Sequence, residues 1–266
     1  MTWIVGTGTM FGHAVLASDI RATVKYSTGE ESHIDCLQKV YPLGNFVVGG
    51  FAGSVKIGFA IIGQLQAELA VVDEGNVWSL DIIANTWLPR VVRKIFNSFP
   101  LSEKIFKSQI ILASMHPTIN WPFPNTSLPV VYKFESPDFE PQKAAQDEVL
   151  GIGNGSIIEC MIEVNEICKK PFFHETIYGG AQYQAMYVAN ILEGVIKKIP
   201  LPGVSNLFQF ATVNRKQIEI FNHERSLCTE EGNKPILKFP PVLAKSFEQL
   251  KKMVVKSGVN LEGATC

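Results

Sequence analysis

The sequence is poor in the residues that build metal sites and disulfide frameworks. It has 5 cysteines and 5 histidines in 266 residues, without a C-x-x-C pair and without a spacing typical of metal ligands. An odd number of scattered cysteines favours reduced thiols in a cytoplasmic compartment. We therefore expect no metal site, no disulfide scaffold and no cofactor held by these residues.

Long hydrophobic runs and a strong net charge are also lacking. No apolar run reaches the roughly 18 residues that a membrane-spanning helix needs. The formal net charge is −1, which gives no electrostatic reason to expect nucleic acid as a partner. The first residues do not read as a secretory leader. Hydrophobic residues make up 46% of the chain and charged residues only 18%, so the composition predicts a large buried core.

The apolar pattern predicts blocks of strands and helices rather than a strict alternation. The expected strands are 2–9, 14–17, 37–43, 45–50, 109–113, 130–134, 149–151, 207–213 and 217–221, the first two joined by a turn at 10–12, and the expected helices are 54–69, 79–96, 157–167, 181–199 and an amphipathic tail over 240–256. This order favours two sheets with helices packed outside them. We expect one domain over 1–223, with 224–266 packed on it as an extension.

The chemistry begins with Thr2, directly after Met1. Removal of the methionine would leave a threonine that carries both a hydroxyl and a free α-amine. An α-amine has a pKa of about 7.7–8.0, so it can accept the hydroxyl proton without a separate histidine. The competing interpretation is an ordinary first residue of a strand.

Charged residues follow at Asp19, Arg21 and Lys39. Asp19 and Arg21 are two residues apart in an extended segment, where Asp19 would pair with a buried cation and Arg21 would tune it. Lys39 lies in an apolar stretch, and a buried lysine needs a carboxylate partner, for which Asp19 is the candidate. The lysine charge would lower the pKa of a nearby α-amine. The competing interpretation is a set of solvent-exposed charges at strand ends.

A glycine-rich turn, Gly49-Gly50-Phe51-Ala52-Gly53-Ser54, connects an expected strand to an expected helix. Backbone N–H groups at such a turn can face a developing oxyanion, and the helix dipole adds a favourable potential. Gly53 is the natural donor because a side chain there would obstruct the approach. The competing interpretation is a turn that needs glycine only for its backbone angles.

Four segments, T-W-I-V-G, S-D-I-R-A-T, Q-K-V and G-F-A-G-S, occur in this order within the first 54 residues. Together they resemble the proteasome β subunit and its bacterial relatives of the HslV type, including the spacing from Lys39 to Gly53. The remaining chain resembles this family more loosely. The resemblance implies an α+β fold, a four-layer αββα sandwich of two antiparallel sheets between helix layers, with a C-terminal helical extension. It also implies a peptidase whose N-terminal threonine is the nucleophile.

The resemblance assigns roles to individual residues. Thr2 would supply the nucleophile and its base, Asp19 and Lys39 would set the charge state, and Gly53 N–H would hold the oxyanion. The implied substrate-binding residues are Ala22 and Thr23, through their backbone, and Phe51, as the wall of a shallow specificity pocket.

The sequence departs from the family pattern at two supporting positions. Gly153-Asn154-Gly155 replaces a G-S-G turn, with Ser156 one step further on, so Asn154 and Ser156, together with Arg21, become the candidate supporting residues. A later D-x-x-S motif is missing, and residues 198–201 stand in its place.

Several functions stay open at this point. The preferred one is a threonine hydrolase that acts on a peptide or protein substrate, forms a homo-oligomeric ring and needs no cofactor. Whether it has a partner ATPase is not determined. The alternatives are an inert structural ring subunit, a non-peptide amidase, and a dinucleotide site at Gly151 to Ser156, which lacks an evident βαβ context.

Overall fold

The structure is a computed structural model, and it describes residues 2–9, 13–25, 30–70, 79–115, 129–145, 148–168, 180–201, 203–214, 217–222, 227–231, 234–238, 242–256 and 264–265. Met1, the expected turn at 10–12 and the expected boundary between residues 223 and 224 lie outside these ranges.

A five-stranded antiparallel sheet carries the N-terminal segment at its interior. Its order is β10-β1-β2-β11-β12. The strands are β1 (Ile4–Thr9), β2 (His13–Asp19), β10 (Val149–Ile152), β11 (Phe208–Val213) and β12 (Ile218–Asn222). Ile4 lies opposite Ser18 on one side and Ile152 on the other, so β1 is paired along both edges.

A second five-stranded antiparallel sheet has the order β5-β6-β7-β8-β9. Its strands are β5 (Val40–Gly44), β6 (Val47–Ala52), β7 (Gln109–Met115), β8 (Pro129–Glu135) and β9 (Gln142–Lys143). It faces the first sheet across a buried apolar cluster that includes Ile4, Leu16, Ile111 and Val131. The sheets approach so closely at Gly6 that a Cβ there would lie 2.7–2.9 Å from side-chain atoms of Leu16, Ile111 and Val131.

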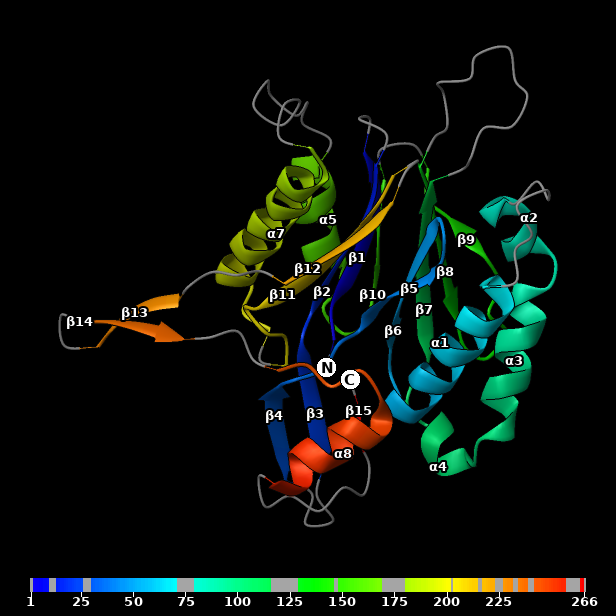
Figure 1. The fold of residues 1–266 in the computed structure, drawn as a ribbon, viewed down its shortest axis with the longest axis horizontal. Coiled ribbons are helices and arrows are strands. Elements are labelled where there is room, and N and C mark those ends of the chain that lie inside the picture. Colours follow the sequence, from blue (N-terminus) through cyan, green and yellow to red (C-terminus); the bar gives the residue numbers. More distant parts are fainter. Residues whose placement is uncertain are drawn as a thin grey trace.

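Helices cover the other face of each sheet (Figure 1). Those beside the first sheet are α5 (Ile158–Cys168) and α7 (Gly180–Lys198), and those beside the second are α1 (Val55–Leu69), α2 (Leu80–Asn85), α3 (Leu88–Ser98) and α4 (Leu101–Lys104). Because successive strand residues point to opposite faces, Val5 packs against α5 and α7 while its neighbour Ile4 faces the second sheet. None of the helices in the described ranges combines the length and apolar character that crossing a bilayer requires.

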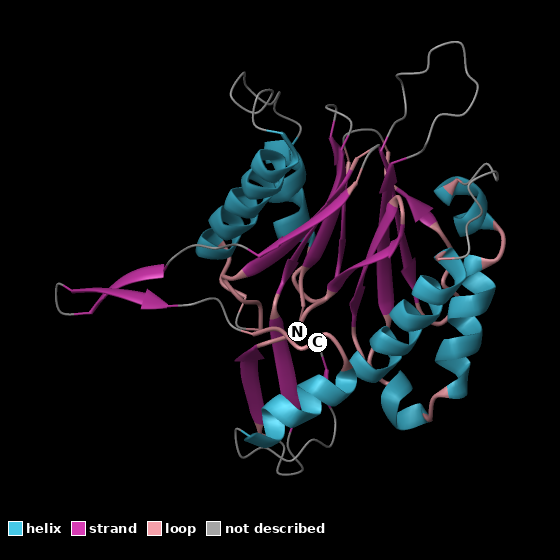
Figure 2. Cartoon of the chain, in the orientation of Figure 1, coloured by secondary structure: helices cyan, strands magenta, loops and turns pink. Residues whose placement is uncertain are grey.

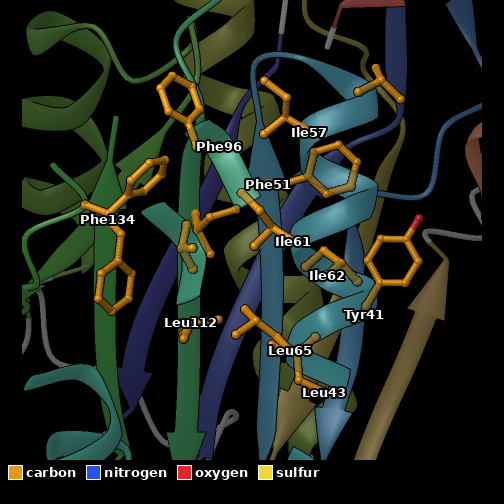
Figure 3. Close-up of a cluster of buried hydrophobic side chains, with 14 of the residues drawn as sticks. Tyr41, Leu43, Phe51, Ile57, Ile61, Ile62, Leu65, Phe96, Leu112 and Phe134 are labelled. Atoms are coloured by element: carbon orange, nitrogen blue, oxygen red, sulfur yellow. The ribbon is translucent and has the colours of Figure 1, made fainter. Parts of the chain in front are cut away.

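The helices beside the second sheet bury the largest apolar cluster in the described residues. Phe51 and Leu112 from the sheet meet Ile57, Ile61 and Leu65 of α1 (Figure 3). The helical spacing of the α1 residues, one turn apart, places them on the face that meets the sheet.

Two small antiparallel sheets complete the described structure (Figure 2). One has the order β15-β3-β4, and the other pairs β13 with β14. Their strands are β3 (Arg21–Lys25), β4 (Glu31–Asp35), β13 (Leu227–Glu231), β14 (Lys234–Lys238) and β15 (Ala264–Thr265). The last helix, α8 (Phe247–Lys256), buries Leu250 and Val254 in the cluster that surrounds α1.

The fold class predicted from the sequence is wrong. A four-layer αββα sandwich with a helical extension has two sheets, whereas the strands in the described part of the chain form four antiparallel sheets. The C-terminal part is not simply helical either, because it contributes the β13–β14 hairpin and the strand β15, which pairs with β3 near the start of the chain. The sequence pattern missed these strands because short pairings between distant segments leave no periodic signal.

Two helix boundaries also differ from prediction. The helix expected over 79–96 is divided into α2 and α3, because Pro89 fits the first turn of a helix and would break one that ran through it. The tail helix begins at Phe247 rather than near 240.

Candidate active site

A fully buried ion pair lies at the centre of the candidate site. Lys39 Nζ is 2.8 Å from Asp19 Oδ1, and both side chains are 0% exposed. The predicted pairing of these two residues is therefore present. Removal of two charges from water is expensive, so such a pair persists only where the carboxylate is also well hydrogen-bonded.

The Asp19 carboxylate meets that condition through three backbone N–H donors. Trp3 N donates to Oδ1 at 2.8 Å, Arg21 N donates to Oδ2 at 3.0 Å, and Ser205 N donates to Oδ2 at 3.4 Å. Because Trp3 N and Lys39 Nζ contact the same oxygen, each at 2.8 Å, they cannot be farther apart than twice that distance. The lysine ammonium therefore lies beside the peptide bond that joins Thr2 to Trp3.

Thr2 is fixed through its backbone, and its hydroxyl has no hydrogen-bond partner among the described residues. Its side chain is 0% exposed, and within the described ranges Oγ1 is buried with no hydrogen-bond partner. Its carbonyl accepts a hydrogen bond from Gly155 N at 3.0 Å. An unpartnered buried hydroxyl is costly for stability, and in native proteins such a group calls for an explanation.

A glycine turn between β10 and α5 cradles Thr2. Gly153 has φ +85°, and a Cβ there would lie 2.3 Å from the Thr2 carbonyl oxygen and 3.2 Å from its Cβ. At Gly155 a Cβ would meet the Trp3 side chain at 2.3 Å. Both glycines are thus required by the close approach of Thr2 and Trp3, and Gly153 is required also by its positive φ.

The two candidate supporting residues in this turn differ in position. Asn154 is exposed at the tip of the turn. Ser156 donates its backbone N–H to Gly153 O at 3.0 Å, while its Oγ is buried with no partner in the described structure. Of the two residues, Ser156 therefore has a polar side-chain atom buried in the protein, whereas Asn154 is exposed to solvent.

The predicted oxyanion glycine, Gly53, lies at the junction of β6 and α1. Its φ is +102°, and a Cβ there would lie 1.6 Å from the Lys107 carbonyl oxygen and 3.1 Å from Ser108 Cα. The obstruction that a side chain would cause thus comes from the chain's own 107–108 segment. Ser54 follows as the N-cap of α1, with its Oγ accepting from Ile57 N and donating to Glu103 Oε2.

The two glycine turns meet at one segment. Gly153 N donates to Gln109 Oε1 at 2.7 Å, and Gln109 directly follows the residues that border Gly53. Thr2 and Gly53 are therefore both linked to the start of β7, Thr2 through Gly153 and Gly53 through residues 107–108. Sequence reasoning missed Gln109, because a polar first residue of a strand carries no distinctive pattern.

Arg21 interacts differently from the prediction. Its guanidinium forms a two-pronged pair with Asp35, at 2.7 and 3.1 Å, and donates to Val204 O at 3.2 Å. Its backbone N–H donates to Asp19 Oδ2. The hydrogen bonds that Arg21 donates to the Asp35 carboxylate raise the pKa of Arg21. Arg21 therefore supports the site by fixing β3, β4 and the 204–205 segment that contacts Asp19.

Burial raises the pKa of the neighbouring Cys36 thiol to about 11. The Asp35 charge adds to this shift, and the Lys39 charge opposes it. Cys36 is therefore a protonated, unreactive thiol at neutral pH, unsuited to act as a nucleophile.

The predicted substrate-binding residues do not face an open surface. The Ala22, Thr23 and Phe51 side chains are all buried. Phe51 packs against Phe59 and Tyr41 between β6 and α1 (Figure 3), so it does not form the wall of a pocket. The β3 backbone at Thr23 is paired with β4 on one edge and with β15 on the other, so no edge is left open there for a substrate.

Ser205 is a further residue that the sequence did not indicate. Residues 198–201 were placed where the family carries a supporting serine, yet the structure brings Ser205 against Asp19, and its side chain is buried. Elsewhere in the described ranges, no three His, Cys, Asp or Glu side chains come together as a metal site requires.

Comparisons of the sequence with protein-family models and with curated proteins gave no match.

Proposed function

We propose that this chain is a threonine hydrolase that cleaves peptide bonds through an acyl ester on Thr2 Oγ1, after the peptide bond before Thr2 has been cut. The observation that carries the proposal is the Thr2 hydroxyl, which has no hydrogen-bond partner among the described residues and lies close to the Asp19–Lys39 pair. The residues of the site, and not the fold, support this function, because one fold can host many functions.

In the proposed first step, the free α-amine of Thr2 takes the proton from Oγ1 as that oxygen attacks the substrate carbonyl carbon. The nearby Lys39 ammonium disfavours a second positive charge, which keeps the amine in its neutral, basic form. Asp19 fixes the ammonium in place and is itself held by the three backbone donors. The backbone N–H of Gly53, at the start of α1, is the proposed donor to the oxyanion.

In the second step, the carbon–nitrogen bond of the substrate breaks and the Thr2 ammonium returns its proton to the departing amine. Water then attacks the acyl ester with the same amine as base, which releases the acid and regenerates the hydroxyl. The proposed reaction uses only groups of this chain and water. Cys36, Cys160 and Cys168 are free thiols, which supports a reducing, cytoplasmic setting.

The complete burial of Thr2 favours a second function, that of an inert structural subunit in a homo-oligomer. Exposed apolar side chains on α5 would suit such assembly, since Ile158 is 75% and Ile162 54% exposed. Three results together would support this function over hydrolysis: a multimer in light scattering, retention of Met1 in the intact mass, and no labelling of Thr2 by an epoxyketone.

The hydrolase proposal predicts a covalent adduct at Thr2 with an epoxyketone, which closes a ring onto a hydroxyl and a free amine on adjacent carbons. Intact mass should first show loss of Met1. Labelling should then be abolished in Thr2→Ala and retained, more slowly, in Thr2→Ser. Thr7→Ser, which changes a buried threonine of the following strand β1, should label like the parent. Labelling that survives Thr2→Ala would refute the proposal.

A further inference from the structure

The strand β3 begins at the candidate site. Arg21 N donates to the same carboxylate that accepts Trp3 N, so a single side chain, Asp19, joins the start of β3 to the Thr2–Trp3 peptide. Thr23 lies two residues further along the strand. A peptide laid along β3 would therefore extend away from the proposed nucleophile.

One edge of β3 is covered by the last described residues of the chain. Thr265 lies opposite Thr23, and Ala264 lies opposite Val24, in antiparallel register. The opposite edge is occupied by β4, where Thr23 faces His33 and their side chains approach to 3.1 Å. Residues 264 and 265 also contact α1, the helix that starts after Gly53 and Ser54.

The Ala22 and Thr23 side chains are buried, so β3 presents mainly its backbone to β15. An open strand edge is a template for another strand, and proteins use it to bind extended peptides through main-chain hydrogen bonds. A pairing of only two residues supplies few such bonds and can be exchanged for a longer peptide.

We propose that the edge of β3 opposite β4 is a peptide-binding edge, and that residues 264–265 occupy it as a tethered ligand which a substrate peptide must displace. That the displacing peptide is a substrate rests on the proposed hydrolase function, whereas the occupancy of the edge by residues 264–265 does not depend on that function. Seven residues separate Lys256 from Ala264 in the sequence, and a connection this short gives an intramolecular ligand an effective concentration of about millimolar.

The test uses a full-length protein in which residues 264 and 265 are both changed to proline, in a Thr2→Ala background. Two consecutive prolines remove whichever N–H points at β3. Thr265→Ala alone, in the same background, is the matched control because it keeps the backbone donors. The probe is a fluorescein-labelled peptide with the sequence of residues 260–266, under reducing conditions.

We expect the double-proline variant to bind this peptide about tenfold more tightly, or better, than the parent and the Thr265→Ala control, by fluorescence anisotropy. Hydrogen exchange at residues 22–25 should be faster in the double-proline variant and slow again on addition of the peptide. A variant that ends at residue 263 should behave like the double-proline protein. Equal affinity in all variants, or unchanged exchange at residues 22–25, would overturn the proposal.

Neither binding readout requires catalysis, which separates the two proposals. With Thr2 intact, peptide hydrolysis should rise in the double-proline variant. Tight peptide binding without hydrolysis or epoxyketone labelling in any variant would uphold the docking edge and overturn the hydrolase function.

Discussion

Two ion pairs flank the candidate active site, and the protein holds them in different ways. Asp19 and Lys39 are both fully buried, and the carboxylate is saturated by backbone donors. Lys56 and Glu103 lie beyond Gly53, where the lysine side chain is 40% exposed and the carboxylate also accepts from Ser54 Oγ, the N-cap of α1.

The second pair has a structural task, since it stabilises the start of a helix. The Asp19–Lys39 pair caps no helix. Its carboxylate accepts from the backbone N–H groups of Trp3, Arg21 and Ser205, and so joins the residue after Thr2 to two other segments. Burying a charge pair is at best a weak source of stability, and a hydrophobic pair of the same volume often serves as well. The difference teaches that the Asp19–Lys39 pair is better explained by its position beside Thr2 than by a need for stability.

The largest expected effect that sharpens this comparison comes from Lys39→Met. The substitution leaves the Asp19 carboxylate buried without its counter-charge, and we expect a loss of about 3–5 kcal/mol in the free energy of unfolding. Urea denaturation measures it. Lys107→Met, at an 80% exposed lysine, is the control and should change stability by less than about 0.5 kcal/mol. Similar values for the two variants would show that the buried pair is solvated.

A smaller effect concerns pH and Cys36, whose pKa rises from 9.0 to about 11 beside this pair. The folded state favours the neutral thiol, so its contribution is complete below pH 9 and is lost as the pH rises from 9 to 11. We expect the stability difference between the parent and Cys36→Ala to shrink by roughly 2 kcal/mol across this range. If the free energies of unfolding of the two proteins changed equally with pH between 9 and 11, the raised pKa of Cys36, and the burial that causes it, would be contradicted.

The smallest effect is expected from Lys56→Met. Its half-exposed ion pair is screened by solvent, so its loss should cost about 0–1 kcal/mol and diminish further in high salt. Chemical denaturation at low and high salt measures both values. A cost as large as that of Lys39→Met would erase the distinction between the two pairs.

Much of the candidate site could be predicted from the sequence where a local rule applies. A lysine in an apolar stretch needs a carboxylate, and Asp19 was the available one. Gly53 was expected to lack a side chain so that a substrate carbonyl could approach its N–H. Its φ of +102° and the clash that a Cβ would make with Lys107 O instead fit the competing interpretation, a turn that needs glycine for its backbone. The catalytic roles of these residues remain predictions.

The rest of the site could not be predicted from the sequence. Phe51 was assigned to a pocket by the family resemblance. Side-chain direction in a strand depends on which neighbour covers that face, and here α1 covers it. Gln109 and Ser205 reach the site from segments with no distinguishing pattern.

The sequence by itself determined the alternation that buries β1 and β2 on both faces, the glycine positions that admit close backbone contacts, and the need of Lys39 for an acidic partner. Only the tertiary structure decided that the strands in the described ranges form four sheets and that residues 264–265 pair with β3. These outcomes depend on contacts between segments far apart along the chain, and a two-residue strand has no periodicity by which its partner could be recognised.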